Sequence, residues 1–317
     1  MDGRTAEMLH TKGATFVFLG VPKGTVFGID LKCWRTDEEF RGIRLIPPGM
    51  HYIYYASASE TEIDDVSQRS GFFQYFNEND IIVKMWDKKT EDVSKEVVDE
   101  HTVERIRENL NNIDRYLAPY PYDIWSRWHC LTRQISGTVM RFTEIPKNKY
   151  PPGSSPMEIT KHHLDQSYTL ELMIAQHDEP LHIIGELQFA YTIFLIGHYW
   201  NGFDHWRNLV VLLCSCEDAL DKYRDVFIHF IATIQHQMKE LPLEFLCGIE
   251  MEQNVFYKKF REFFRNVYSA KSNQKLVIMI EKFKKSLADL FQWEFPNDDT
   301  DDEDEKPVVV EMEEINE

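Results

Sequence analysis

The hydrophobic pattern of the first 90 residues predicts short β-strands. Apolar or alternating runs recur at about ten-residue spacing and are separated by Gly and Pro, which is typical of a sandwich or barrel. Gly28, inside one of these runs, marks a bulge or a close approach of another segment. A βαβ alternation is not seen, which argues against a Rossmann-type domain. The candidate strands are 15–19, 25–31, 40–46, 50–56, 71–76 and 80–86.

The pattern changes to a helical period after residue 100. Apolar residues from Val103 to Leu117 recur at spacings of three and four, which predicts a helix over 101–117. Pro, Gly and Ser then cluster in 150–157, the clearest linker signal in the chain. The candidate helices beyond this linker are 158–176, 181–199, 203–223, 225–240, 245–269 and 273–292.

These patterns predict an α+β protein with two domains and a tail. Residues 1–157 form an antiparallel β-sandwich-like domain, which carries the helix 101–117 and ends in the Pro-rich linker 150–157. Residues 158–296 form an all-α domain, because long helices joined by short loops pack antiparallel. Residues 297–317 have the composition of an acidic disordered tail.

Composition supports a folded protein and restricts its partners. The 317 residues are 43% hydrophobic, which is enough to build a core. They include 35 Lys and Arg against 53 Asp and Glu, a formal net charge of −18. An acidic protein of this kind does not coat nucleic acid with its whole surface, although a local basic patch is compatible with the total.

The charge is distributed unevenly near the C-terminus. Residues 258–285 contain nine basic and two acidic residues, whereas 297–317 contain eleven acidic residues and one lysine. The basic stretch is either the solvated face of two amphipathic helices or a surface that binds RNA. The basic-face candidates are Lys258, Lys259, Arg261, Arg265, Lys282 and Lys285.

The tail itself suggests two roles. Val308, Val309 and Val310 are β-branched residues in an otherwise acidic segment. Such a segment can add a strand to the exposed sheet edge of a partner, and plain disorder is the alternative. Independently, the acidic run 298–305 can screen the basic stretch 258–285 in the free protein.

The sequence contains no recognisable catalytic motif. GxGxxG, GxxxxGK[ST], HExxH and GxSxG do not occur in it. Cys214 and Cys216 are two residues apart in a predicted helix, so their thiols point in different directions and cannot chelate one ion. The histidine pairs lack a third ligand. We therefore predict a protein that is not an enzyme and that has no cofactor and no metal.

The cysteines and the apolar runs indicate the compartment. The five cysteines are scattered without a CxxC pair, and residues 1–15 lack the apolar core of a signal peptide. Apolar runs stay well below the ~18 residues that a membrane span needs. We expect an intracellular, reducing compartment and no membrane contact.

Three blocks of sequence together resemble one family. The first is Gly20–Asp30 with Trp34 and Phe40–His51, and the second is Tyr150–Pro156 with Leu164-Asp165 and Ser167-Tyr168. The third is Gly185–Ala190 with Phe194–Gly197, His205-Trp206 and Leu212–Cys214 with Glu217. In this order they cover most of 15–292 and are similar to the Aar-two family of splicing factors.

The resemblance implies a fold and a function. The fold is a β-sandwich-like domain followed by a helical, VHS-like superhelical domain. Members of this family assist assembly of the U5 snRNP in pre-mRNA splicing. They bind the large U5 scaffold protein through its RNase H-like and Jab/MPN-like domains and keep the U5 helicase off it. The implied partners are that scaffold and the cytoplasmic U5 precursor particle, with any RNA contact secondary, and the implied location is both cytoplasmic and nuclear.

The family blocks do not identify the residues that contact the scaffold, because they consist mostly of Gly, Pro and apolar residues. Asp204, His205, Trp206 and Arg207 mix polar and aromatic types beside a Gly-containing helix break, which makes them interface candidates. A tryptophan at this position can equally be a packing anchor. An RNA-binding factor that acts through 258–285 stays open as the alternative function.

Overall fold

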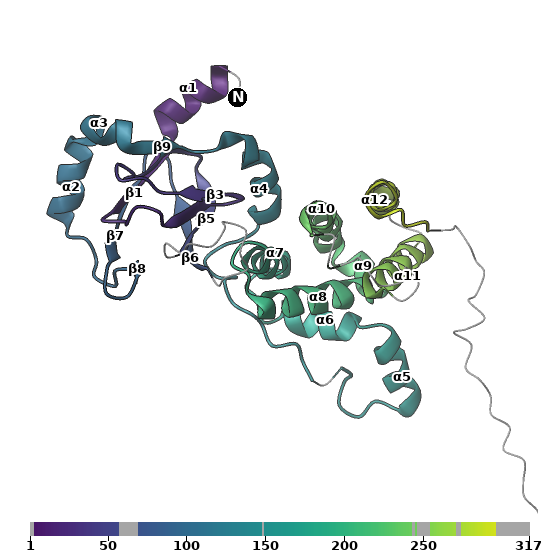
Figure 1. Ribbon diagram of the computed structural model, residues 1–317. Coiled ribbons are helices and arrows are strands. Elements are labelled where there is room, and N and C mark those ends of the chain that lie inside the picture. Colours follow the sequence, from purple (N-terminus) through teal and green to yellow (C-terminus); the bar gives the residue numbers. More distant parts are fainter. Residues whose placement is uncertain are drawn as a thin grey trace, which may run out of the picture.

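The computed structural model describes residues 3–56, 69–147, 149–242, 245, 254–270 and 274–295 (Figure 1). A sheet-rich part precedes an all-helical part, and this confirms the predicted α+β fold class. A helix that the strand pattern did not predict, α1 (Gly3–Lys12), comes before the first strand.

The first of two sheets has the strand order β8-β7-β1-β4-β9 and is mixed. Its central strand, β1, pairs antiparallel with β4 but parallel with β7, and β9 pairs parallel with β4. The prediction of a purely antiparallel domain is therefore wrong for this sheet, because β7 and β9 enter it after long excursions of the chain. Its strands are β1 (Ala14–Leu19), β4 (Gly42–Ile46), β7 (Ile81–Asp87), β8 (Asp92–Val93) and β9 (Leu117–Pro119).

The second sheet has the order β3-β2-β5-β6 and is antiparallel throughout. Gly28 on β2 pairs with Tyr54 on β5, and a Cβ at Gly28 would lie 2.1 Å from the Tyr54 ring. The predicted close approach is therefore confirmed. The strands of this sheet are β2 (Val26–Ile29), β3 (Lys32–Arg35), β5 (Gly49–Ala56) and β6 (Ser70–Phe76).

Aromatic side chains fill the space between the sheets. Phe16 and Phe18 on β1 lie 6.3 Å and 6.0 Å from the ring of Phe27 on β2, and Trp86 on β7 contacts Phe18 edge-on. All four are buried, and each such ring removes a large apolar area from water.

The predicted helix 101–117 is shorter and broken. Asp99 caps α2 (Glu100–Glu108) by accepting a hydrogen bond from Thr102 N, and Asn109 ends this helix. Two short turns follow, α3 (Leu110–Ile113) and η1 (Asp114–Tyr116), and the chain then enters β9. Pairing with β4 takes Leu117 out of the helix, an effect that helical periodicity does not report.

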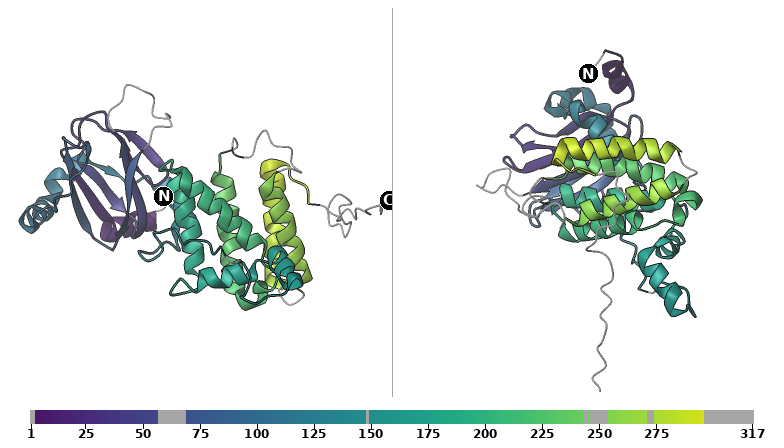
Figure 2. Two further views of the ribbon diagram at one scale, coloured as in Figure 1. Left: turned by 90° about the horizontal axis from the view of Figure 1, so that it is seen from below. Right: turned by 90° about the vertical axis from the view of Figure 1, so that its right-hand side faces the viewer.

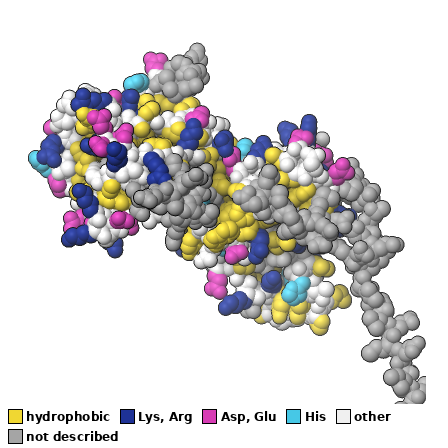
Figure 3. All heavy atoms as spheres, viewed as in Figure 1, with side chains coloured by type: hydrophobic (Ala, Val, Ile, Leu, Met, Phe, Trp, Pro, Cys, Tyr) yellow, Lys and Arg dark blue, Asp and Glu magenta, His cyan; other side chains and the backbone are white. Residues whose placement is uncertain are grey.

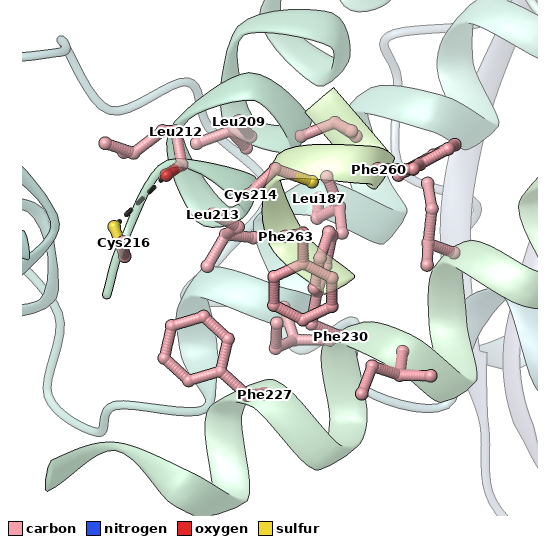
Figure 4. Close-up of a cluster of buried hydrophobic side chains, with 14 of the residues drawn as sticks. Leu187, Leu209, Leu212, Leu213, Cys214, Cys216, Phe227, Phe230, Phe260 and Phe263 are labelled. Carbon is pink, nitrogen blue, oxygen red and sulfur yellow. Dashed lines mark hydrogen bonds between the residues drawn. The ribbon is translucent and has the colours of Figure 1, made fainter. Parts of the chain in front are cut away.

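The helical part packs its long helices around one core, part of which Figure 4 shows. Leu187, Phe230 and Phe263 meet there with Cys214, and burial raises the pKa of the Cys214 and Cys216 thiols. The helices are α5 (Pro156–Leu164), α6 (Ser167–Ile174), α7 (His182–Leu195), α8 (Trp200–Cys214), α9 (Ala219–Lys222), α10 (Arg224–Glu240), α11 (Val255–Ser269) and α12 (Gln274–Phe291).

Helix α4 (Trp125–Thr132), preceded by the turn η2 (Tyr122–Ile124), joins the two parts (Figures 1 and 2). The Trp128 indole is fully buried, and its Nε1 donates to Met50 O of β5 at 2.7 Å. On the other side Arg127 Nε donates to Glu240 Oε1 of α10 at 2.7 Å. The chain thus contacts the helical part well before the Pro-rich segment 150–157.

Candidate protein-interaction surface

The four interface candidates lie on α8, where they cannot share one face. Successive helical residues are about 100° apart, so Asp204 and Arg207 share a side while His205 and Trp206 point elsewhere. Asp204 and Arg207 are exposed and form an i,i+3 ion pair, with Nη2 and Oδ1 3.6 Å apart. Asp204 and Arg207 are therefore surface residues that a partner could contact.

Trp206 is a packing anchor. Its side chain is fully buried, its Nε1 donates to Gln237 Oε1 at 2.8 Å, and its ring packs 5.2 Å from both Tyr191 and Phe256. The candidate role of Trp206 at an interface is contradicted, because its apolar area and its one donor are both satisfied inside the core.

A different tryptophan of α8, Trp200, is exposed at the surface. Trp200 begins α8 and is 56% exposed, and Tyr199 beside it is 46% exposed. Trp200 precedes Asp204 by four residues and Arg207 by seven, so the three share one face, which we call the α8 stripe. The Trp200 ring rests 5.9 Å from Phe194 and 5.8 Å from Phe245. Figure 3, viewed as Figure 1, shows hydrophobic side chains gathered in the region of α7 and α8.

The sequence pattern missed Trp200 because it placed the start of this helix at residue 203. The signal was present, since a helix that starts at residue 200 puts Trp200, Asp204 and Arg207 at helical spacing. Trp and Arg are the residue types most enriched among energetically dominant interface residues.

His205 lies on another face of α8 than the stripe and contacts the segment that follows α4. Its Nε2 lies 2.6 Å from Glu186 Oε1, and its ring stacks on Phe142 at 4.5 Å. Thr143 donates to the same carboxylate from its N at 2.5 Å and its Oγ1 at 2.7 Å, and His177 Nε2 is 3.0 Å away. The segment after α4 is thereby bound to α7 and α8.

The protonation of Glu186 follows from these contacts. Burial alone raises the pKa of this carboxyl, but close contact with His177 and the hydrogen bonds with His205 and Thr143 outweigh burial and lower the pKa to about 2. The carboxylate is fully buried and occupied by donors. The group is therefore built to hold structure together, and its geometry does not suit proton transfer to a substrate.

The family block that contains Glu186 is explained by the same segment. Gln188 Oε1 accepts from Gln134 N at 2.8 Å, and its Nε2 donates to Cys130 O at 3.3 Å. A Cβ at Gly185 would lie 2.3 Å from Gln134 O, so this position requires glycine. The block thus holds the segment 130–143 against α7.

A second buried charged group lies in the sheet-rich part. Asp30 Oδ2 accepts from Tyr120 OH at 2.6 Å and lies 2.7 Å from His51 Nδ1, while His51 Nε2 lies 2.8 Å from Pro47 O. Burial and the Asp30 carboxylate raise the pKa of Tyr120. This Asp–His arrangement resembles a catalytic pair, but both imidazole nitrogens are engaged and the His51 ring is fully buried.

The basic candidates lie on the neighbouring helices α11 and α12. Lys258 and Arg265 are exposed on α11, and Lys282 and Lys285 are exposed on α12. Lys259 differs, since its Nζ lies 2.6 Å from Glu262 Oε2 and 2.8 Å from Ser215 Oγ. Arg261 is half-buried and engaged as well. Four of the six candidates therefore offer their charge to solvent.

The remaining candidates, Val308, Val309 and Val310, lie outside the described residues. Within the described ranges, three or more His, Cys, Asp or Glu side chains do not come together in a way that could hold a metal ion. No helix in that part of the chain is long and apolar enough to span a membrane.

Two family models match the chain. Residues 12–144 match the AAR2 N-terminal domain and residues 142–296 match the AAR2 C-terminal repeat region, AAR2 being the family written Aar-two above. Relatives named "Protein AAR2 homolog" from Mus musculus and Homo sapiens are each 32% identical over 375 aligned residues, which cover 98% of this chain and 97% of the relative. The Caenorhabditis elegans protein of that name is 26% identical over 351 residues, covering 91% and 96%.

Proposed function

The chain belongs to the AAR2 family, and from this premise we propose that it is an assembly factor of the U5 snRNP in pre-mRNA splicing. It binds the large U5 scaffold protein through the scaffold's RNase H-like and Jab/MPN-like domains and excludes the helicase until assembly is complete. The observation that carries the proposal is the match of both AAR2 domains, in order, across residues 12–296. The work is non-catalytic and takes place in the cytoplasm and the nucleus.

The α8 stripe is the proposed contact with the scaffold. A stable interface covers about 800 Å² on each partner, and its energy is concentrated in a few aromatic and Arg side chains. Trp200 and Arg207 have the chemistry of such anchors, and exposed Tyr199 beside Trp200 extends the apolar area. Rigid support from α7 means that little chain entropy is lost on binding.

The tail supplies a second contact. Val308, Val309 and Val310 would add a strand to an exposed sheet edge of the scaffold. Deleting residues 297–317 should then weaken scaffold binding by about tenfold or more, because main-chain pairing and buried valine side chains are lost together. Isothermal titration of the full and shortened chains checks this, and equal affinities would refute the strand.

The alternative is an RNA-binding factor. The observation in its favour is the exposure of four of the six basic candidates, Lys258, Arg265, Lys282 and Lys285, on α11 and α12. If RNA is the main partner, binding should weaken steeply as salt rises, because each phosphate contact releases counterions.

The two functions are distinguished by a pull-down from cytoplasmic extract with the full chain as bait, with and without RNase. The proposed function predicts recovery of the U5 scaffold without its helicase, unchanged by RNase. The double variant W200A/R207A should lose this scaffold, whereas the matched control variant E179Q, an exposed change, should retain it. Partners that disappear with RNase, or no scaffold at all, would favour the RNA-binding function.

A further inference from the structure

Helices α11 and α12 present an unscreened cationic surface. They lie side by side on the outside of the helical part (Figure 2), where Lys284 Nζ of α12 donates to Tyr268 OH of α11 at 2.8 Å. Lys258, Arg265, Lys282 and Lys285 point away from the core, and we call them the basic face. Among the described residues none of the four has an ion-pair partner, although exposed Asp289 lies one turn from Lys285.

The nearest glutamates are already engaged. Glu262 pairs with Lys259 at 2.6 Å, and Glu281 lies 3.8 Å from Lys284 and also accepts from Tyr268 OH. Lys284 itself is partly desolvated over the Phe264 ring at 5.4 Å. These two glutamates therefore contact half-buried lysines, and Asp289 is a further acid of α12 that lies one turn from an outward cation.

The segment that follows α12 packs against α11. After α12, Trp293 is buried against Tyr257, and Tyr257 OH donates to Glu294 O at 2.8 Å. The Phe295 ring then lies 5.0 Å from Tyr257 and 5.1 Å from Phe264. These two α11 residues directly precede Lys258 and Arg265, so the exit point is fixed beside the basic face.

The segment that follows fits this face in charge and in length. Residues 298–305 hold seven acidic residues in eight and start three residues beyond Phe295. At ~3.3 Å per extended residue, the first acid reaches ~10 Å from Phe295 and the run extends a further ~23 Å. A 15-residue helix such as α11 is ~22 Å long, so the run can follow its whole length.

We propose that the acidic run 298–305 docks on the basic face in the free protein and screens it from polyanions. Tethering at Phe295 gives the run an effective concentration on the order of millimolar. Even weak charge pairing is then populated, while salt and competing polyanions can still displace it. The inference goes beyond scaffold binding, and it holds or fails independently of the α8 stripe.

Zero-length carbodiimide crosslinking of the full chain tests the docking, since it joins carboxylates to amines that are in contact. Peptides that join 298–305 to Lys258, Lys282 or Lys285 are expected at 30 mM salt and should fall several-fold at 0.5 M. Lys88, Lys89 and Lys95 are exposed lysines of the sheet-rich part and serve as the internal control. Crosslinks spread evenly over both sets, or none to the basic face, would overturn the docking.

Binding of a fluorescent 20-nucleotide oligouridylate tests the screening. In the tail variant, the Asp and Glu residues of 298–305 become Asn and Gln, which preserves the length. This variant should bind at least about tenfold more tightly than the native chain at low salt. Adding K258Q, K282Q and K285Q should remove the gain, whereas the control changes K88Q, K89Q and K95Q should keep it. Equal affinity of the native and neutral-tail chains would overturn the screening.

Discussion

At the scale of single residues, two tryptophans on one helix have opposite roles. Trp206 points into the core and bonds Gln237, whereas Trp200 lies on the surface with Asp204 and Arg207. Position on the helix decides this, because a shift of six residues turns a side chain well away from its starting direction. Residue type alone could not distinguish the two before the start of α8 was known.

Replacing each tryptophan by alanine should separate stability from binding. W206A should lower the free energy of unfolding by about 3–5 kcal/mol, because it leaves a large cavity and an unpaired Gln237. W200A should change stability by less than about 1 kcal/mol but weaken scaffold binding by about 2 kcal/mol. Urea denaturation and titration calorimetry measure the two effects. A W200A chain that unfolds as readily as W206A would contradict the assignment.

Glu186 makes stability depend on acid. Its folded pKa of about 2 lies below the ordinary 4.5, so its contribution is complete above pH 4.5 and disappears as pH falls toward 2. E186Q should therefore cost about 3 kcal/mol at pH 7, with the difference from the native chain narrowing between pH 4.5 and 2. Denaturation at several pH values checks this, with exposed E179Q as control. A constant difference across that range would contradict the origin assigned to the low pKa.

At the scale of elements, strands and helices with a strong period were predictable and those made by long-range pairing were not. The alternation in β5 and β7 and the apolar spacing in α12 identified all three. The strands β3, β8 and β9 are only two to four residues long. Each forms by pairing with a longer strand: β3 with β2, β8 with β7 and β9 with β4. The predicted helix 158–176 splits at Asp165, whose carboxylate accepts from Ser167, Glu217 and Asp218 backbone N–H groups.

The candidate surface residues were less predictable than the elements, because several depend on contacts between residues far apart in the sequence. Four of the six predicted basic-face residues are exposed, whereas Lys259 and Arg261 are half-buried and engaged. Nothing in the local pattern showed that the Gly185 block binds the segment 130–143, because Glu186 and Thr143 are 43 residues apart. A contact of this length depends on the tertiary fold.

Gly185 tests the contact between α7 and that segment. G185A should destabilise the protein by about 1–3 kcal/mol, because the new methyl group would collide with Gln134 O and Val139 Cγ2. The matched control is G137A, where a Cβ would meet open space. Thermal unfolding compares the two variants. A G185A chain as stable as G137A would show that the segment is not held tightly against α7.

At the scale of the whole molecule, the two domains are joined by a buried contact around α4. Trp128 and Ile196 pack with Tyr52 and Tyr54 of the second sheet, and Arg127 is paired with Glu240. The α8 stripe begins beside this seam, since Gly197 lies close to Tyr52. The contact around α4 therefore lies close in sequence to the start of the stripe, whose own printed contacts are with the helical part.

The most direct test of the assembly-factor function is a competition with purified components. A scaffold fragment with the RNase H-like and Jab/MPN-like domains is immobilised, saturated with the U5 helicase and titrated with the full chain. We predict that the chain binds the fragment and releases the helicase, and that W200A/R207A needs at least about tenfold more protein to do so. Failure of the native chain to bind, or simultaneous binding of chain and helicase, would contradict the proposed function.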